Sequence, residues 1–147
     1  MDGPRCRFAV DFGASSLIAL AQQGTEHNSI DAVLLTHLHG AHAAIREVLF
    51  PGSHVMTPRF PVDWIEMEPG RPHPVLDLLV IPECARHTEE TNPTARRIQV
   101  GDKAICYTCD TEWTDEVARA AQDTDLLIAE SYFYDKPALT PAGWAPG

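Results

Sequence analysis

The stretch "THLHGAH", from Thr36 to His42, contains three histidines within six residues. In extended backbone, residues two apart point to the same side, so His37 and His39 can aim both imidazoles at one point. His42 follows about one helical turn later and can reach the neighbouring space. Neutral imidazole is a common zinc ligand, and this spacing is typical of a metal chelate. The alternative is an exposed, histidine-rich loop, because short motifs also occur by chance.

The segment before the histidines is a near-continuous apolar run over residues 32–35. Such a run predicts a strand buried on both faces. The histidines begin where that strand should end, which is where α/β proteins commonly place their sites.

Length and charge limit the classes of protein. The 147 residues predict one domain, 1–147, with an irregular Pro- and Gly-rich tail over 136–147. The net charge of -10 disfavours an extended nucleic-acid surface, which is normally basic. No apolar run has the length of a membrane span, and no secretory signal is evident, so we expect a cytoplasmic protein that does not bind membranes.

Strand and helix patterns alternate along the chain, which predicts an α/β layered domain. The last expected helix has Thr114 as its cap, and the first has Ser15 or Ser16. Residues 95–100 and 103–108 form a strong hairpin pattern around Gly101-Asp102. Expected strands lie at 7–11, 32–35, 62–68, 75–82, 95–100, 103–108 and 125–130, and expected helices at 16–23, 41–50 and 114–122.

The chain has four cysteines, which we expect to be free thiols in a reducing compartment. Cys84 and Cys109 are conceivable metal ligands, although burial as free thiols is the more common outcome. Cys106 and Cys109 form C-x-x-C. Redox motifs of this type lie at a helix N-terminus, and these two end a strand, so thiol redox chemistry is the weaker alternative.

The motifs together resemble the metallo-β-lactamase fold. "THLHGAH" resembles its T-H-x-H-x-D-H signature, and "RHTEETNPTARRIQVGDKAICYTCDTEW" resembles the segment with a third metal histidine and a bridging aspartate. Within that superfamily the chain is most similar to the ribonuclease Z-like branch of metal-dependent hydrolases. The resemblance implies an αββα layered sandwich, here incomplete because the opening strands and the closing elements are missing.

The resemblance also implies a ligand set: His37, His39 and His87 for the first zinc, His42 for the second, and Asp110 between the two. Asp110 would in addition be a weak catalytic candidate, since a carboxylate beside a metal can position water and accept its proton. Asp11 would hold the histidine loop by hydrogen bonds. Taken singly, His87 is also compatible with an exposed loop, and both aspartates with turns.

This sequence departs from the family pattern at the second metal. Ala41 stands where the signature has Asp, and no histidine follows His87. Cys109 replaces a glycine, which is harmful if the turn needs a positive φ. We therefore expect one zinc, with manganese as the alternative metal, and an incomplete second site.

Two functions remain open. The first is a zinc-dependent hydrolase that acts on a phosphodiester or another ester, with a small molecule or a phosphodiester as substrate. A nucleic-acid substrate is a further alternative, which the acidic charge does not support. The second is a truncated, catalytically impaired relative that binds one metal without turnover. Because missing strands would leave sheet edges uncovered, we also expect a homo-oligomer or an aggregation-prone monomer.

Overall fold

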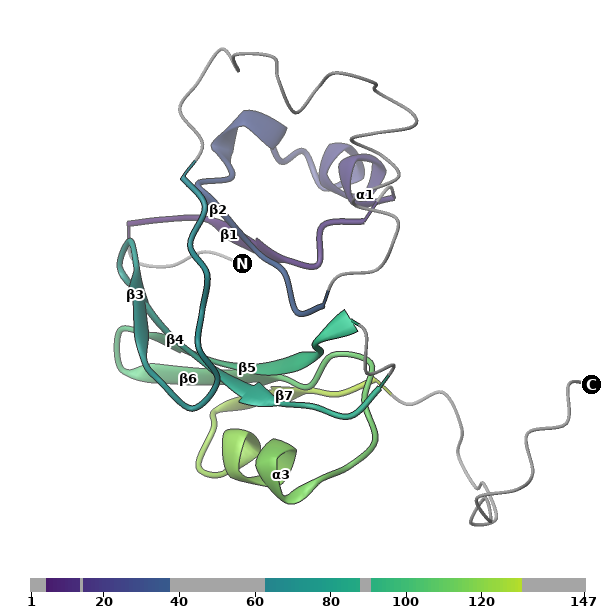
Figure 1. Ribbon diagram of the computed structural model, residues 1–147. Coiled ribbons are helices and arrows are strands. Elements are labelled where there is room, and N and C mark those ends of the chain that lie inside the picture. Colours follow the sequence, from purple (N-terminus) through teal and green to yellow (C-terminus); the bar gives the residue numbers. More distant parts are fainter. Residues whose placement is uncertain (1–4, 14, 38–62, 88–90, 131–147) are drawn as a thin grey trace, which may run out of the picture.

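A computed structural model of the chain describes residues 5–13, 15–37, 63–87 and 91–130 (Figure 1). The expected helix over 41–50 and the tail over 136–147 lie outside these residues. The elements in chain order are β1 (Phe8–Val10), α1 (Ser16–Gln22), the 3-10 helix η1 (His27–Ser29), β2 (Ala32–Leu34), β3 (His73–Val75), β4 (Leu78–Cys84), β5 (Thr94–Val100), β6 (Lys103–Tyr107), α3 (Asp115–Ala121) and β7 (Leu126–Ile128).

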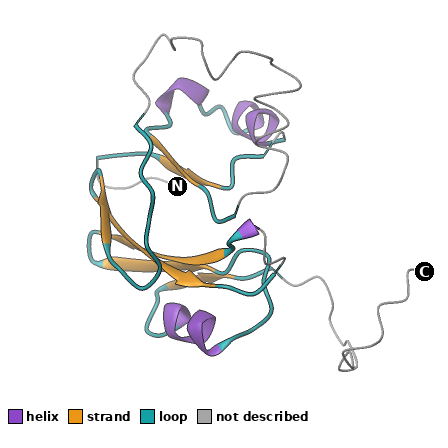
Figure 2. Ribbon diagram, viewed as in Figure 1, coloured by secondary structure: helices purple, strands orange, loops and turns teal. Residues whose placement is uncertain are grey.

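The strands form two sheets. β1 and β2 make a parallel pair, and the second sheet has the order β3-β4-β5-β6-β7. Within it, β3 to β6 are antiparallel neighbours, and β7 runs parallel to β6. Figures 1 and 2 show α1 beyond the small sheet and α3 on the far face of the large one. The order helix, sheet, sheet, helix confirms the predicted α/β layering.

Two apolar cores hold these layers together, and β5 contributes to both because alternate residues of a strand face opposite ways. Ile98 faces the small sheet, and Ala95 faces α3. The first core contains Cys6, Phe8, Leu34, Val75, Leu78, Val80 and Ile98, and the second contains Ala95, Cys106, Val117 and Ala120.

Local signals near the C-terminal half were predicted correctly. β5 and β6 pair as the expected hairpin, with Val100 opposite Lys103 and Gly101 in the turn at φ 61°. The Thr114 hydroxyl caps α3 by accepting the N–H of Val117 at 3.3 Å. At α1, by contrast, the Ser15 side chain makes no capping hydrogen bond.

Burial of the short strands was predicted incorrectly. Val33 of β2 is 46% exposed, and Leu126 and Leu127 of β7 are 49% and 44% exposed. In the part of the chain that the structure describes, each of these strands pairs on one side only. An apolar run indicates that a segment is suited to burial. It does not show whether neighbouring elements cover that segment.

The expected strand over 75–82 is in fact a hairpin. β3 ends at Val75 and β4 begins at Leu78, with Leu76 at φ 55° in the turn between them. The expected strand over 62–68 is also wrong, because residues 63–68 form no strand and Trp64 is 71% exposed. Among the described helices, none combines the length and apolar character that crossing a membrane requires.

Candidate metal centre

The two sheets are joined by hydrogen bonds between the end of β2 and the start of β5. The backbone N–H and the hydroxyl of Thr94 both donate to the carbonyl oxygen of Thr36, at 2.8 and 2.9 Å. Nη2 of Arg96 donates to the carbonyl oxygen of Leu35 at 2.5 Å. The backbone that leads into His37 is therefore fixed from the large sheet. These residues are called the seam below: Leu35, Thr36, Thr94 and Arg96.

Asp11, directly after β1, fixes the same backbone from the small sheet. Its carboxylate accepts the backbone N–H of Thr36 at 2.9 Å and the hydroxyl of Thr36 at 2.5 Å. Asp11 has φ 48°, a left-handed conformation that aspartate tolerates better than most residues. These bonds are of the kind that the family resemblance implied for Asp11. Its part in metal binding stays a prediction.

Thr36 also determines which nitrogen of His37 carries the proton. Its hydroxyl lies 2.8 Å from Nδ1 of His37. A hydroxyl has one proton, and an ionised carboxylate can only accept, so that proton is given to Asp11. Nδ1 of His37 must then be the donor, and in the neutral ring the lone pair lies on Nε2. This is the arrangement in which an imidazole ligates a metal through Nε2.

His87 and Asp110 are brought together by their neighbours in two loops. Arg86 donates its N–H to the hydroxyl of Thr111 at 2.8 Å, and Glu112 donates its N–H to the carbonyl of Arg86 at 2.9 Å. As a result, Nε2 of His87 lies 3.5 Å from Oδ2 of Asp110, with the side chains 28% and 47% exposed.

His37 lies beside this pair. The ring centroids of His37 and His87 are 6.0 Å apart, and the rings are inclined at 74°. Because β4 and β6 both run antiparallel to β5, their carboxyl ends meet at one edge of the large sheet. His87 follows β4 and Asp110 follows β6 at that edge. The hydrogen bonds of the seam hold His37 near them.

The described residues supply only part of the predicted ligand set. His39, Ala41 and His42 lie outside them. No group of three or more His, Cys, Asp or Glu side chains within the described ranges is placed closely enough to hold a metal. His37, His87 and Asp110 lie near one another without forming such a group. Two imidazoles and a carboxylate are donors of the type that zinc prefers, so their chemistry fits the metal.

Cys109 has the backbone conformation that makes its Cβ unfavourable. Its φ is 57°, in the region that glycine adopts without strain. The side chain is 1% exposed. Burial, with a smaller effect of the charges on Asp11 and Asp110, raises the pKa of the Cys109 thiol to about 12.

The raised pKa values of Cys106 and Cys109 disfavour the thiol redox alternative. Reactive cysteines have a lowered pKa, whereas burial also raises the pKa of Cys106. Both are free thiols. Cys84 is free as well, but it is exposed rather than buried.

Arg96 is the residue near the site that sequence reasoning missed. It is 8% exposed, and burial lowers the pKa of its guanidinium, while the charge of Asp11 acts in the opposite direction. A signal was present in the sequence: with Ile98 facing inward, strand alternation places Arg96 on the same inner face.

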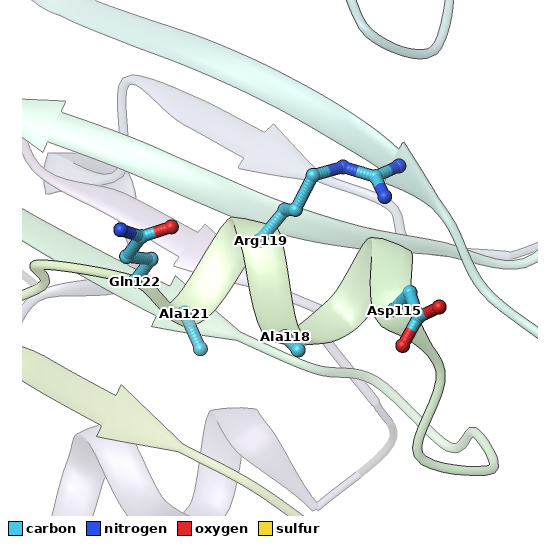
Figure 3. Close-up of a pocket in the computed structure, with 5 residues that line it drawn as sticks. All are labelled: Asp115, Ala118, Arg119, Ala121 and Gln122. Atoms are coloured by element: carbon cyan, nitrogen blue, oxygen red, sulfur yellow. The ribbon is translucent and has the colours of Figure 1, made fainter.

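A separate depression of about 640 Å³ lies on the other side of the large sheet (Figure 3). It holds none of the predicted site residues. Its lining comes from α3 and the residue after it: Asp115, Ala118, Arg119, Ala121 and Gln122.

Comparison with known proteins supports a fold assignment. No profile of a known protein family matches the chain, and no curated protein sequence matches it. Among solved structures, the chain is similar to the metallo-β-lactamase fold protein YhfI from Bacillus subtilis, with a TM-score of 0.61 and 23% sequence identity. The match covers 80% of this chain and 56% of that one, so this chain spans little more than half of its length. On this likeness and on its layered architecture, the chain has the metallo-β-lactamase fold.

Proposed function

We propose that the chain is a zinc-dependent hydrolase of the metallo-β-lactamase superfamily, similar to the ribonuclease Z-like branch. The observation that carries this proposal is that His87 lies close to both His37 and Asp110 at one edge of the large sheet. The fold similarity to YhfI adds support.

The chain's own residues would hold the metal. Nε2 of His37, the imidazole of His87 and the carboxylate of Asp110 are the described donors, and the sequence pattern adds His39 and His42. When bound, zinc supplies Lewis acidity, which lowers the pKa of a water to about 7 and polarises an ester or phosphoryl oxygen. Manganese is the alternative metal.

Asp110 would have a second task. Its carboxylate is partly exposed, so it can orient a water molecule and accept its proton during attack on the substrate. The substrate class that we propose is a small phosphodiester or another ester. The net charge of -10 argues against an extended nucleic-acid partner.

A second candidate is a protein that binds one metal without turnover. The observation that favours it is Ala41, whose methyl group can neither ligate a metal nor accept a proton, at the position where the signature has Asp. Loss of general-base help commonly costs about 10²–10⁴-fold in rate. We therefore expect slow hydrolysis at best, close to the uncatalysed rate.

One experiment separates the two candidates. The chain is loaded with zinc or with manganese, and hydrolysis of bis(p-nitrophenyl) phosphate is followed beside the His37→Ala variant. Turnover above background that this variant loses would support the hydrolase. Stoichiometric zinc without turnover would support the second candidate. A chain that binds neither metal would contradict both.

A further inference from the structure

The small sheet covers only part of the inner face of the large sheet. Among the described residues, the core between the two sheets takes its large-sheet members from β3, β4 and β5, and none from β6 or β7. These members are Val75, Leu78, Val80 and Ile98. The inner face of β6 and β7 therefore continues the apolar face of the sheet beyond the core.

Four side chains lie on this uncovered part of the face. Cys106 of β6 packs in the second core on the α3 side, so strand alternation turns Ile105 and Tyr107 the other way. β7 runs parallel to β6 with Leu126 beside Ile105, so Leu126 and Ile128 share that face. Leu126 is 49% exposed, and the other three are partly buried. These residues are called the apolar strip below: Ile105, Tyr107, Leu126 and Ile128.

The apolar strip leads to the candidate metal centre. Because β6 and β7 are parallel, their carboxyl ends lie at the same edge of the sheet, and Asp110 follows β6 three residues after Tyr107. There, Oδ2 of Asp110 lies 3.5 Å from Nε2 of His87. The carboxyl ends of parallel strands are a common place for ligands in α/β proteins. A group held on the strip would lie beside the proposed reacting centre.

The dimensions of the strip favour a small apolar group over a protein partner. Neighbouring strands lie about 4.8 Å apart, and alternate residues of a strand about 6.7 Å apart, so the four Cα atoms outline an area close to that of one aromatic ring. A stable protein interface needs about 800 Å² on each partner, which four side chains do not provide. The ring of Tyr107 adds a surface against which another aromatic ring packs favourably.

We propose that the apolar strip binds an aromatic or similarly compact apolar group of the substrate, so that the chain acts on esters or phosphodiesters that carry such a group. This inference rests on the proposed function for the reaction itself. Binding of the apolar group to the strip requires no metal, so it can be measured separately.

The test titrates two probes into the metal-free protein. Bis(p-nitrophenyl) phosphate carries aromatic rings, and dimethyl phosphate has the same charge without them. The readout is the ¹³C-methyl NMR spectrum of the isoleucine and leucine side chains. We expect the aromatic probe to shift the methyl signals of Ile105, Leu126 and Ile128, and dimethyl phosphate to leave them in place.

Leu126→Gln and Leu127→Gln form a matched pair of variants. The two leucines are neighbours with similar exposure, 49% and 44%, on opposite faces of β7. Leu126→Gln should weaken binding of the aromatic probe roughly tenfold, since one methylene in an apolar pocket is commonly worth about that factor or more. Leu127→Gln should leave it unchanged. In the zinc-loaded chain, Leu126→Gln should raise KM at constant kcat, because it removes binding that ground state and transition state share.

Equal responses to the two probes, or equal effects of the two substitutions, would overturn the proposal. If Leu126→Gln does not fold, the titration of the natural chain decides, and an aromatic probe that shifts none of the three methyl-bearing side chains of the strip contradicts it. If the natural chain binds the aromatic probe at the strip but hydrolyses nothing with either metal, the proposed function fails, while the strip as a binding surface is supported.

Discussion

Arg96 and Arg97 are neighbours on β5, yet the two faces of that strand hold them in opposite ways. Arg97 donates to carbonyl oxygens at the C-terminal end of α3, where a helix has unpaired acceptors and favours positive charge. Arg96 is enclosed at the seam, with part of its guanidinium unsatisfied in the described part of the chain. On the α3 face the arginine is paired with carbonyl acceptors, as local stability favours. On the seam face part of the arginine is buried without such acceptors in the described part of the chain.

Other features divide along the same line. On the α3 side, Thr114 caps the helix. On the seam side, buried nitrogens of Arg96 lack a partner within the described part of the chain, and Asp11 and Cys109 have positive φ, a conformation that Asp123 shares in the turn after α3. The two sides therefore differ in how their buried polar groups are satisfied, and the proposed site lies on the seam side.

The largest effect should come from removing a ligand on the seam side. We expect about one zinc per chain in the natural protein, and His37→Ala or His87→Ala should leave it with almost none, because each removes an imidazole from the predicted set. Elemental analysis after dialysis against a weak chelator measures this. His73→Ala is the control, since that histidine lies in β3 and accepts the N–H of Glu68. Zinc retained after loss of both His37 and His87 would refute the site.

The next effect concerns the core between the sheets. Ile98 is 0% exposed, so Ile98→Ala should lower the free energy of unfolding by about 2–5 kcal/mol. Chemical denaturation gives the value. Ile65→Ala is a matched control because Ile65 is 54% exposed, and its change should stay within about 0.5 kcal/mol. Equal losses in the two variants would show that the sheets do not pack as described.

On the α3 side, Thr114→Ala should lower the free energy of unfolding by about 1 kcal/mol, because it leaves a helix N–H without its cap. Zinc content should not change. If this variant lost zinc, the division of the molecule into two functionally distinct faces would be wrong.

The smallest effect isolates backbone strain at Cys109. Glycine adopts a φ of 57° freely, whereas alanine does not. Both substitutions remove the thiol, so Cys109→Gly should be more stable than Cys109→Ala by roughly 0.5–1 kcal/mol. Thermal unfolding of the two variants in parallel measures the difference. A more stable alanine variant would count against the left-handed conformation.

The sequence predicted best those parts of the fold that local signals determine. Gly101-Asp102 between two alternating segments is enough for the β5–β6 hairpin, and Thr114 is enough for the start of α3. The hairpin at Leu76 was missed because it turns through a left-handed leucine without a glycine to mark it. The exposure of Val33 depends on which other elements cover β2. The apolar sequence of β2 itself does not show this.

The candidate site was partly predictable for a similar reason. The spacing of His37 and His39 indicated a chelate, and the resemblance added His87, Asp110 and Asp11. The resemblance also implied the hydrogen bonds of Asp11 to the histidine loop. The other interactions that orient these side chains were not predictable, because they join segments far apart in the chain. Thr94 meets Thr36 across 58 positions, and Arg96 meets Leu35 across 61.

The two hydrogen bonds that Thr94 makes to the Thr36 carbonyl have a consequence for how this protein can change over evolutionary time. The direction of the His37 imidazole is restrained by hydrogen bonds from both sheets. Substitutions at Thr36 or Thr94 alter these restraints themselves, so we expect drift to be slowest at these two threonines.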